Sequence, residues 1–186
     1  MEKPELLTPE KCCLMVVDPQ ERLMDAIHKP ERLVRNASLL IRCARELQMP
    51  ILATTQYRKG LGPLVEELDA LLAGVPRIDK VEFDAMANPK VKKAFDALPR
   101  QLETVLLTGA EAHICIFQTA VGIMRYGWRP WVVADGVSSR DKHHVGLALD
   151  RLRNLGIPVG PAEMAVYELL HRADGPAFKA MLPHLK

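Results

Sequence analysis

The stretch CCLMVVDPQ, residues 12–20, decides the fold class because six apolar residues end abruptly at an aspartate. The run is continuous rather than alternating, which is typical of a strand whose two faces are both covered. Such strands belong to parallel sheets, in which helices form the crossover connections. Residues 12–17 are therefore predicted to form a buried parallel strand, with Asp18 at its carboxyl end.

Short apolar runs of this kind recur between amphipathic patterns along the whole chain. Five further strands are predicted at residues 51–56, 77–83, 104–108, 129–134 and 157–159. Helices are predicted at residues 30–48, 64–72, 88–98, 113–126, 142–155, 162–170 and 176–182. Alternation of strands and helices predicts an α/β fold, here a three-layer α/β/α sandwich around a six-stranded, mainly parallel, Rossmann-like sheet. We expect a single domain spanning residues 1–186.

The composition argues against nucleic acids and membranes as partners. The 186 residues carry a formal net charge of +2 with scattered Lys and Arg, and aromatic residues make up 5%, so we expect no nucleic-acid partner. No apolar stretch approaches the roughly 20 residues that cross a bilayer, and the first residues, MEKPELLTPEK, lack the apolar core of a secretory signal. Cysteines 12, 13, 43 and 115 form no CxxC pair. We therefore expect reduced cysteines, no membrane partner and a cytoplasmic location.

Polar residues that follow the predicted strands are the candidates for function. Ligands of open α/β sheets bind beyond the carboxyl ends of the strands. That rule selects Asp18, Gln56, Asp135 and the segments 80–83 and 109–115. Each has a structural alternative: Asp18 as a turn residue, Lys80 as a solvated surface residue and Asp135 as a support for its loop.

Cys115 is the candidate nucleophile within GAEAHICIFQTA, residues 109–120. The segment joins a predicted strand to a predicted helix, so backbone N–H groups and the helix dipole would favour a thiolate there. The same N–H groups could stabilise an oxyanion. The alternative is an inert, buried cysteine that only packs against its neighbours. His113 lies two residues earlier, and because such side chains point apart it is expected to be a polar loop residue.

Three motifs in order resemble the isochorismatase-like, or cysteine hydrolase, superfamily. VVDPQ at residues 16–20 is similar to its V-D-x-Q motif, and DKVEFDAM at 79–86 to its K-x-x-F motif. GAEAHICI at 109–116 is similar to its G-x-E/T-x-x-x-C-V motif. TTQYRKGLGP, ADGVSSRD and PAFKAMLPHLK further resemble the small isochorismatase-domain proteins, so the resemblance covers nearly the whole chain.

The resemblance implies a catalytic triad of Cys115, Asp18 and Lys80. In such a triad Asp18 takes the thiol proton, while the ammonium and the helix N-terminus lower the pKa of the thiol. It also implies a cis peptide bond between Ala110 and Glu111, with the backbone N–H groups of Glu111 and Cys115 forming the oxyanion hole. The expected activity is hydrolysis of a C–N bond in a small amide-type substrate, through a thioester acyl-enzyme.

The sequence differs from some members of this superfamily at positions that bear on the substrate. The segment TTQYR, residues 54–58, lacks the D-x-H pair with which nicotinamidases of this superfamily bind metal. We therefore expect no metal and no cofactor, and nicotinamidase activity is disfavoured. Cys115 disfavours the enol-ether hydrolysis of true isochorismatases. Tyr57, Phe83 and Ile114 are the candidate pocket residues, each with a core role as the alternative. The resemblance further implies a homo-oligomer, a dimer or larger.

Two other functions compete with hydrolysis. One is a non-catalytic interaction or scaffold protein that retains the hydrolase fold, which an intact triad alone does not exclude. The other is a nucleotide-binding protein, but the chain has neither GxGxxG nor GxxxxGK[ST] and so lacks a phosphate cradle.

Overall fold

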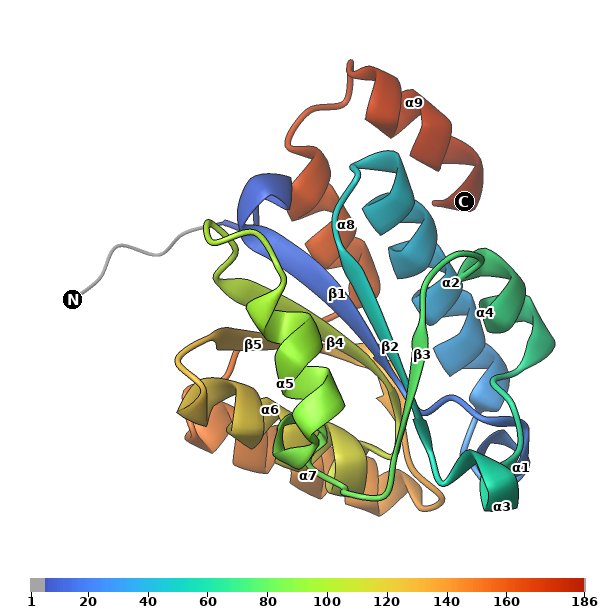
Figure 1. Ribbon diagram of the computed structural model, residues 1–186. Coiled ribbons are helices and arrows are strands. Elements are labelled where there is room, and N and C mark those ends of the chain that lie inside the picture. Colours follow the sequence, from blue (N-terminus) through green and yellow to red (C-terminus); the bar gives the residue numbers. More distant parts are fainter. Residues whose placement is uncertain (1–5, 186) are drawn as a thin grey trace.

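The computed structural model describes residues 6–185, in which six strands form one sheet with parallel pairing throughout (Figure 1). The strands are β1 (Cys12–Val17), β2 (Ile51–Gln56), β3 (Arg77–Lys80), β4 (Thr104–Ala110), β5 (Arg129–Ser138) and β6 (Val159–Gly160). Their order across the sheet is β3-β2-β1-β4-β5-β6. The predicted α/β class is confirmed, and the sheet is all-parallel rather than mainly parallel. The predicted domain limits, residues 1 and 186, lie outside the described residues.

Helices cover both faces of the sheet (Figure 1). They are α1 (Glu21–Met24), α2 (Pro30–Glu46), α3 (Arg58–Leu61), α4 (Glu66–Leu71), α5 (Pro89–Asp96), α6 (Phe117–Arg125), α7 (Lys142–Asn154), α8 (Ala162–Leu170) and α9 (Pro176–Met181). Helices α2, α4, α8 and α9 pack on one face, and α5, α6 and α7 on the other. Within residues 6–185, no helix has the length and apolar character needed to cross a bilayer.

Strand β1 explains why its sequence is continuously apolar. Cys12, Leu14 and Val16 belong to the core beneath α2 and α8, whereas the alternate residues belong to the core beneath α5 and α6. No residue of β1 is more than 1% exposed. The alternation also sends the side chains of Cys12 and Cys13 to opposite faces, and both cysteines are free thiols.

Several elements differ from the prediction in extent. Strand β3 ends at Lys80 instead of residue 83, because the chain turns there to bring the carbonyl of Glu82 onto the Lys80 ammonium. The short helices α1 and α3 follow strand ends and have too few residues to show a helical period. The helix predicted from residue 113 begins as a π-helical turn, Ala112–Ile116, which continues into α6. Asn88 caps α5, accepting from the backbone N–H groups of Lys90 and Val91.

The centre of the sheet holds the carboxyl ends of β1 and β4 side by side. Val17 pairs with Gly109 across these strands, and Gly109 has a φ of +131°. A Cβ at this position would lie 2.0 Å from the carbonyl oxygen of Val17, so only glycine permits the approach. Asp18 follows β1 directly, and the turn containing Cys115 follows β4. The strand order therefore brings these two segments to one place, the switch point of the sheet.

Candidate active site

Asp18 is fully buried at the end of β1, where both of its carboxylate oxygens accept hydrogen bonds. Oδ1 accepts from the hydroxyl of Thr54 at 2.7 Å, and Oδ2 accepts from the ammonium of Lys80 at 2.6 Å. The backbone of Asp18 is left-handed, with a φ of +52°, and its N–H donates to the carbonyl of Thr54. Non-glycine residues in this conformation concentrate at functional sites. Asp18 is thus held in one orientation by its neighbours on β2 and β3.

Lys80 is the largest fully buried side chain of the described residues. Its ammonium donates to Asp18 Oδ2 at 2.6 Å, to Gln56 Oε1 at 2.6 Å and to the Glu82 carbonyl at 3.2 Å. An ammonium has three N–H donors, and all three find acceptors here. A buried charge is tolerated only when it is paired and hydrogen-bonded in this way. The surface role considered for Lys80 is therefore excluded.

Gln56 and Gln20 form hydrogen bonds that hold the side chain of Lys80 in place. The Nε2 of Gln56 donates to the carbonyl of Val81 at 2.8 Å, which leaves Oε1 to face the ammonium. Gln20 accepts the backbone N–H of Gln56 through Oε1 at 2.6 Å and donates to the Gly62 carbonyl at 2.8 Å. The two amides thereby connect the chain around α3 to Lys80.

Cys115 lies beside Asp18, in the π-helical turn after β4, and is 5% exposed. The Asp18 carboxylate lies close enough to the Cys115 thiol to influence its pKa. Burial, followed by the negative charge of Asp18, raises the pKa of Cys115 from 9.0 to about 12, although Lys80 acts in the opposite direction. The expectation of a lowered pKa is wrong, because desolvation and the carboxylate together outweigh the ammonium. At neutral pH the site holds a thiol, with the carboxylate positioned to accept its proton.

The loop between β4 and α6 has the features expected of an oxyanion site. The peptide bond between Ala110 and Glu111 is cis, which confirms that expectation. The backbone of Glu111 favours the charged form of Cys115 and so opposes the rise in its pKa. The side chain of Glu111 is buried and accepts from Arg140 Nε at 2.9 Å, which turns its carboxylate toward Arg140.

The candidate pocket residues lie on segments that adjoin the triad. Tyr57 follows β2, and its backbone N–H donates to the carbonyl of Lys80 at 2.8 Å. Tyr57 and Phe83 are 53% and 51% exposed, so neither is a core residue. Ile114 precedes Cys115 and packs partly buried against the core beneath α6 and α7. A substrate contact for these three residues stays a prediction.

The other two candidates, Asp135 and His113, make hydrogen bonds outside the triad. Asp135 Oδ1 accepts from the N–H of Ala162 at 2.7 Å and so caps α8 instead of facing the triad. His113 hydrogen-bonds to Ser139 at 2.9 Å. His143 lies at the exposed start of α7, whose N-cap is Asp141. Across residues 6–185, no three His, Cys, Asp or Glu side chains are grouped to hold a metal ion.

Sequence reasoning missed the roles of Thr54, Gln56 and Gln20 as hydrogen-bond partners. Gln56 lies at a predicted strand end and Gln20 lies in VVDPQ, but the sequence pattern assigns neither residue a partner. The available signal was the polar ending of β2, Thr54–Thr55–Gln56, because a polar run at the end of a buried strand needs buried partners.

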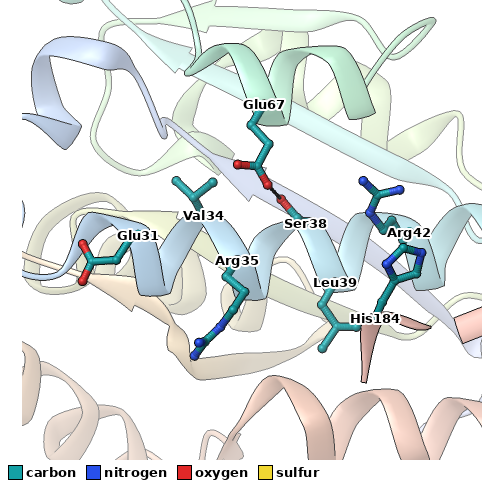
Figure 2. A pocket seen from close by; sticks show the side chains of 8 residues that line it. All are labelled: Glu31, Val34, Arg35, Ser38, Leu39, Arg42, Glu67 and His184. Atoms are coloured by element: carbon teal, nitrogen blue, oxygen red, sulfur yellow. Dashed lines mark hydrogen bonds between the residues drawn. The ribbon is translucent and has the colours of Figure 1, made fainter. Parts of the chain in front are cut away.

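A surface hollow of about 400 Å³ lies elsewhere, on the outer side of α2 (Figure 2). Ser38 in this hollow donates to Glu67 of α4 at 2.8 Å, and His184 comes from the C-terminal segment. Figure 2 shows Arg35 and Arg42 extending in different directions, so the two guanidinium groups do not converge on one ligand position. Asp18, Lys80 and Cys115 do not line this hollow.

Comparison with known proteins supports the resemblance over most of the chain. Isochorismatase domain-containing protein 2 of Rattus norvegicus is 34% identical over 178 residues, which are 96% of this chain and 82% of the rat protein. The structure of MAR1 ribonuclease from Caenorhabditis elegans superposes with a TM-score of 0.90 at 30% identity, covering 97% of this chain and 92% of that one.

YcaC from Escherichia coli, described as an octameric hydrolase of unknown specificity, has the same fold. Its TM-score is 0.88 at 23% identity, and the match covers 98% of this chain and 94% of that one. The family model of the isochorismatase domain matches residues 12–164, which contain Asp18, Lys80 and Cys115. The chain belongs to the isochorismatase family.

Proposed function

We propose that this chain, acting as one domain, is a cysteine hydrolase that cleaves the C–N bond of a small amide-type substrate. The observation that carries the proposal is the buried contact set of Cys115, Asp18 and Lys80. The thiol lies beside the Asp18 carboxylate, and that carboxylate accepts a hydrogen bond from the Lys80 ammonium at 2.6 Å. A nucleophile beside a base that a third group orients is the arrangement of covalent catalysis.

The first half of the reaction forms the acyl-enzyme. Asp18 accepts the thiol proton as the sulfur attacks the carbonyl carbon of the substrate, and the carbonyl oxygen becomes an oxyanion. The N–H groups of Glu111 and Cys115 then donate to that oxyanion. The C–N bond breaks as Asp18 passes its proton to the departing nitrogen, which leaves a thioester on Cys115.

The second half releases the acid. Asp18 takes a proton from water, the water oxygen attacks the thioester carbon, and the C–S bond breaks. The proton returns to the sulfur, so the site regains its thiol. The Lys80 ammonium stabilises Asp18 whenever that carboxylate is ionised. Lys80 stays in place because Gln56 and the Glu82 carbonyl accept from its other N–H groups.

A turnover assay tests the proposal. Ammonia or amine release is measured over a panel of small amides and ureas with wild type, Cys115→Ala and Cys43→Ala. Cys43 is also buried and free, but it lies in α2 away from the triad, so it is the matched control. We expect release from wild type and Cys43→Ala, and a loss of at least about 1000-fold in Cys115→Ala.

The same panel includes an RNA substrate because the C. elegans relative is called a ribonuclease. We expect no RNA cleavage that depends on Cys115. If no amide or urea in the panel is cleaved in a Cys115-dependent way, while the protein keeps a stable protein partner, the scaffold alternative is favoured.

We further propose that the chain forms a homo-oligomer. E. coli YcaC is octameric, and Tyr57, Val81 and Phe83 of this chain expose apolar surface beside the triad, Val81 being 67% exposed. Native mass spectrometry tests this, and a purely monomeric species at micromolar concentration would contradict it.

A further inference from the structure

A second hollow, of about 180 Å³, lies between α7 and the helical turn that carries Cys115. We call it the histidine hollow, and it is lined by His113, Phe117, His144, Leu147, Ala148 and Arg151. Its lining has three basic side chains, three apolar ones and no acidic one. Cys115, Asp18 and Lys80 do not line it. It is therefore a chemically distinct place beside the proposed active site.

Arg151 supplies the permanent charge of the histidine hollow. Its guanidinium carbon lies 4.5 Å from the centre of the Phe117 ring, in a cation–π contact. A guanidinium that rests on an aromatic ring keeps its N–H groups free at the edge, where a carboxylate can bind. Within residues 6–185 no hydrogen bond or ion pair joins Arg151 to a carboxylate.

The imidazoles of His113 and His144 offer hydrogen-bond donors near the Arg151 guanidinium. The rings of His113 and His144 lie 4.7 Å apart, and Nδ1 of His113 is bound to the Ser139 hydroxyl at 2.9 Å. When that hydroxyl donates to Nδ1, the Nε2 of His113 carries the proton and can donate to a ligand. Partial burial lowers the pKa of His113, which keeps the ring neutral and available as a donor.

The nearby acidic groups are already engaged. Glu111 bonds to Arg140, Asp141 accepts from the backbone N–H of His143, and Asp150 bonds to Arg153. None of these carboxylates forms an ion pair with Arg151 within residues 6–185, so its guanidinium is available to a carboxylate ligand.

The apolar part of the hollow favours a ligand that has a hydrocarbon body. Leu147 is 70% exposed on α7, while Phe117 and Ala148 form the inner wall. A volume of about 180 Å³ suits a ligand the size of a single ring.

From these contacts we infer that the histidine hollow binds small carboxylates with an aromatic or branched apolar body. The carboxylate contacts Arg151 and the imidazoles of His113 and His144, and the body packs against Phe117 and Leu147. This site is independent of the proposed hydrolysis, since it needs no reaction at Cys115.

Titration of ¹⁵N-labelled full-length protein with benzoate tests the inference, with benzamide as the neutral probe of nearly equal shape. We expect benzoate to shift the amide signals of residues 113–117 and 144–151, and to bind at least about tenfold more tightly than benzamide. Arg151→Gln should weaken benzoate binding about tenfold and leave benzamide binding unchanged. Arg42→Gln is the control, because Arg42 lies on α2 outside the hollow and its loss should leave both affinities unchanged.

Equal affinities for benzoate and benzamide would overturn the inference, and so would equal benzoate binding by wild type and Arg151→Gln. Benzoate-induced shifts confined to Asp18, Tyr57 and Phe83 would assign the binding to the proposed active site instead. Because the readout is binding, a failure of the hydrolase proposal leaves this test unaffected.

Discussion

The Cys115 thiol is protonated at rest, which predicts how it reacts with an electrophile. Burial and Asp18 raise its pKa to about 12, so the thiolate fraction rises about tenfold for each pH unit from pH 7 to pH 10. The rate of Cys115 alkylation by iodoacetamide should follow that slope. Peptide mass spectrometry measures it at this residue apart from Cys12, Cys13 and Cys43.

A plateau of the alkylation rate below pH 8 would contradict the raised pKa. Lys80→Met provides a second comparison, because the ammonium is the charge that opposes the rise. We expect slower alkylation in this variant. Removal of one partner from a buried ion pair costs about 3–5 kcal/mol, so its folding is checked by circular dichroism first.

Gln56 predicts a stability effect at the site itself. Gln56→Met keeps the length of the side chain but removes the acceptor of Lys80 Nζ, leaving one N–H of a buried ammonium without a partner. Urea denaturation should show a loss of about 1–3 kcal/mol. Gln118→Met, on the exposed face of α6, is the matched control and should stay within about 0.5 kcal/mol of wild type. Equal losses would contradict the role of Gln56.

Single residues of the site were predictable to different degrees. Asp18, Lys80 and Cys115 follow predicted strands, which made them candidates, and the resemblance to the family implied that they form a triad. The partners Thr54, Gln56 and Gln20 depend on which strands are neighbours and in what register, and a buried amide carries no periodic signal. The predicted direction of the Cys115 pKa shift is wrong. Its largest cause is the burial of the thiol, which is a property of the packed structure.

At the scale of elements, the contact between β1 and β4 depends on Gly109. Gly109→Ala adds a Cβ 2.0 Å from the Val17 carbonyl oxygen, at a φ of +131°. We expect a loss of at least about 3 kcal/mol from overpacking and backbone strain together. Gly74→Ala is the control, because Gly74 has a φ of +80° but nothing within 4 Å of the added Cβ. It should cost about 1 kcal/mol.

Urea denaturation of the two glycine variants separates these effects. Similar losses would mean that the positive φ alone matters, and that the close approach of the strands does not.

Element type was easier to predict than element extent. The long amphipathic pattern of α2 and the apolar run of β1 are strong signals, and both elements appear where expected. Contacts at the site determine two of these extents. The end of β3 depends on the hydrogen bond from Lys80 to the Glu82 carbonyl, and the π-helical turn before α6 places Cys115 beside Asp18. Such contacts join residues far apart in the chain, and local patterns do not report them.

At the scale of the whole molecule, the layers followed from the pattern but the strand order did not. Alternating strands and helices require a parallel sheet covered on both faces. The order β3-β2-β1-β4-β5-β6 depends on where each crossover places its strand, and several orders satisfy the same apolar pattern. The order nevertheless creates the site, since it makes β1 and β4 neighbours.

All four buried thiols together predict that the protein loses stability at alkaline pH. Burial raises the pKa of Cys12 to about 11, and those of Cys13, Cys43 and Cys115 to about 12, from an ordinary value of 9.0. Above pH 9 the unfolded chain therefore binds fewer protons than the folded one, so stability falls as pH rises. The four thiols together should lower the stability by about 5 kcal/mol between pH 8 and pH 10. Urea denaturation under reducing conditions should show this fall, and Cys43→Ala should make it about one quarter smaller. An unchanged slope in Cys43→Ala would show that groups other than the buried thiols cause the alkaline loss.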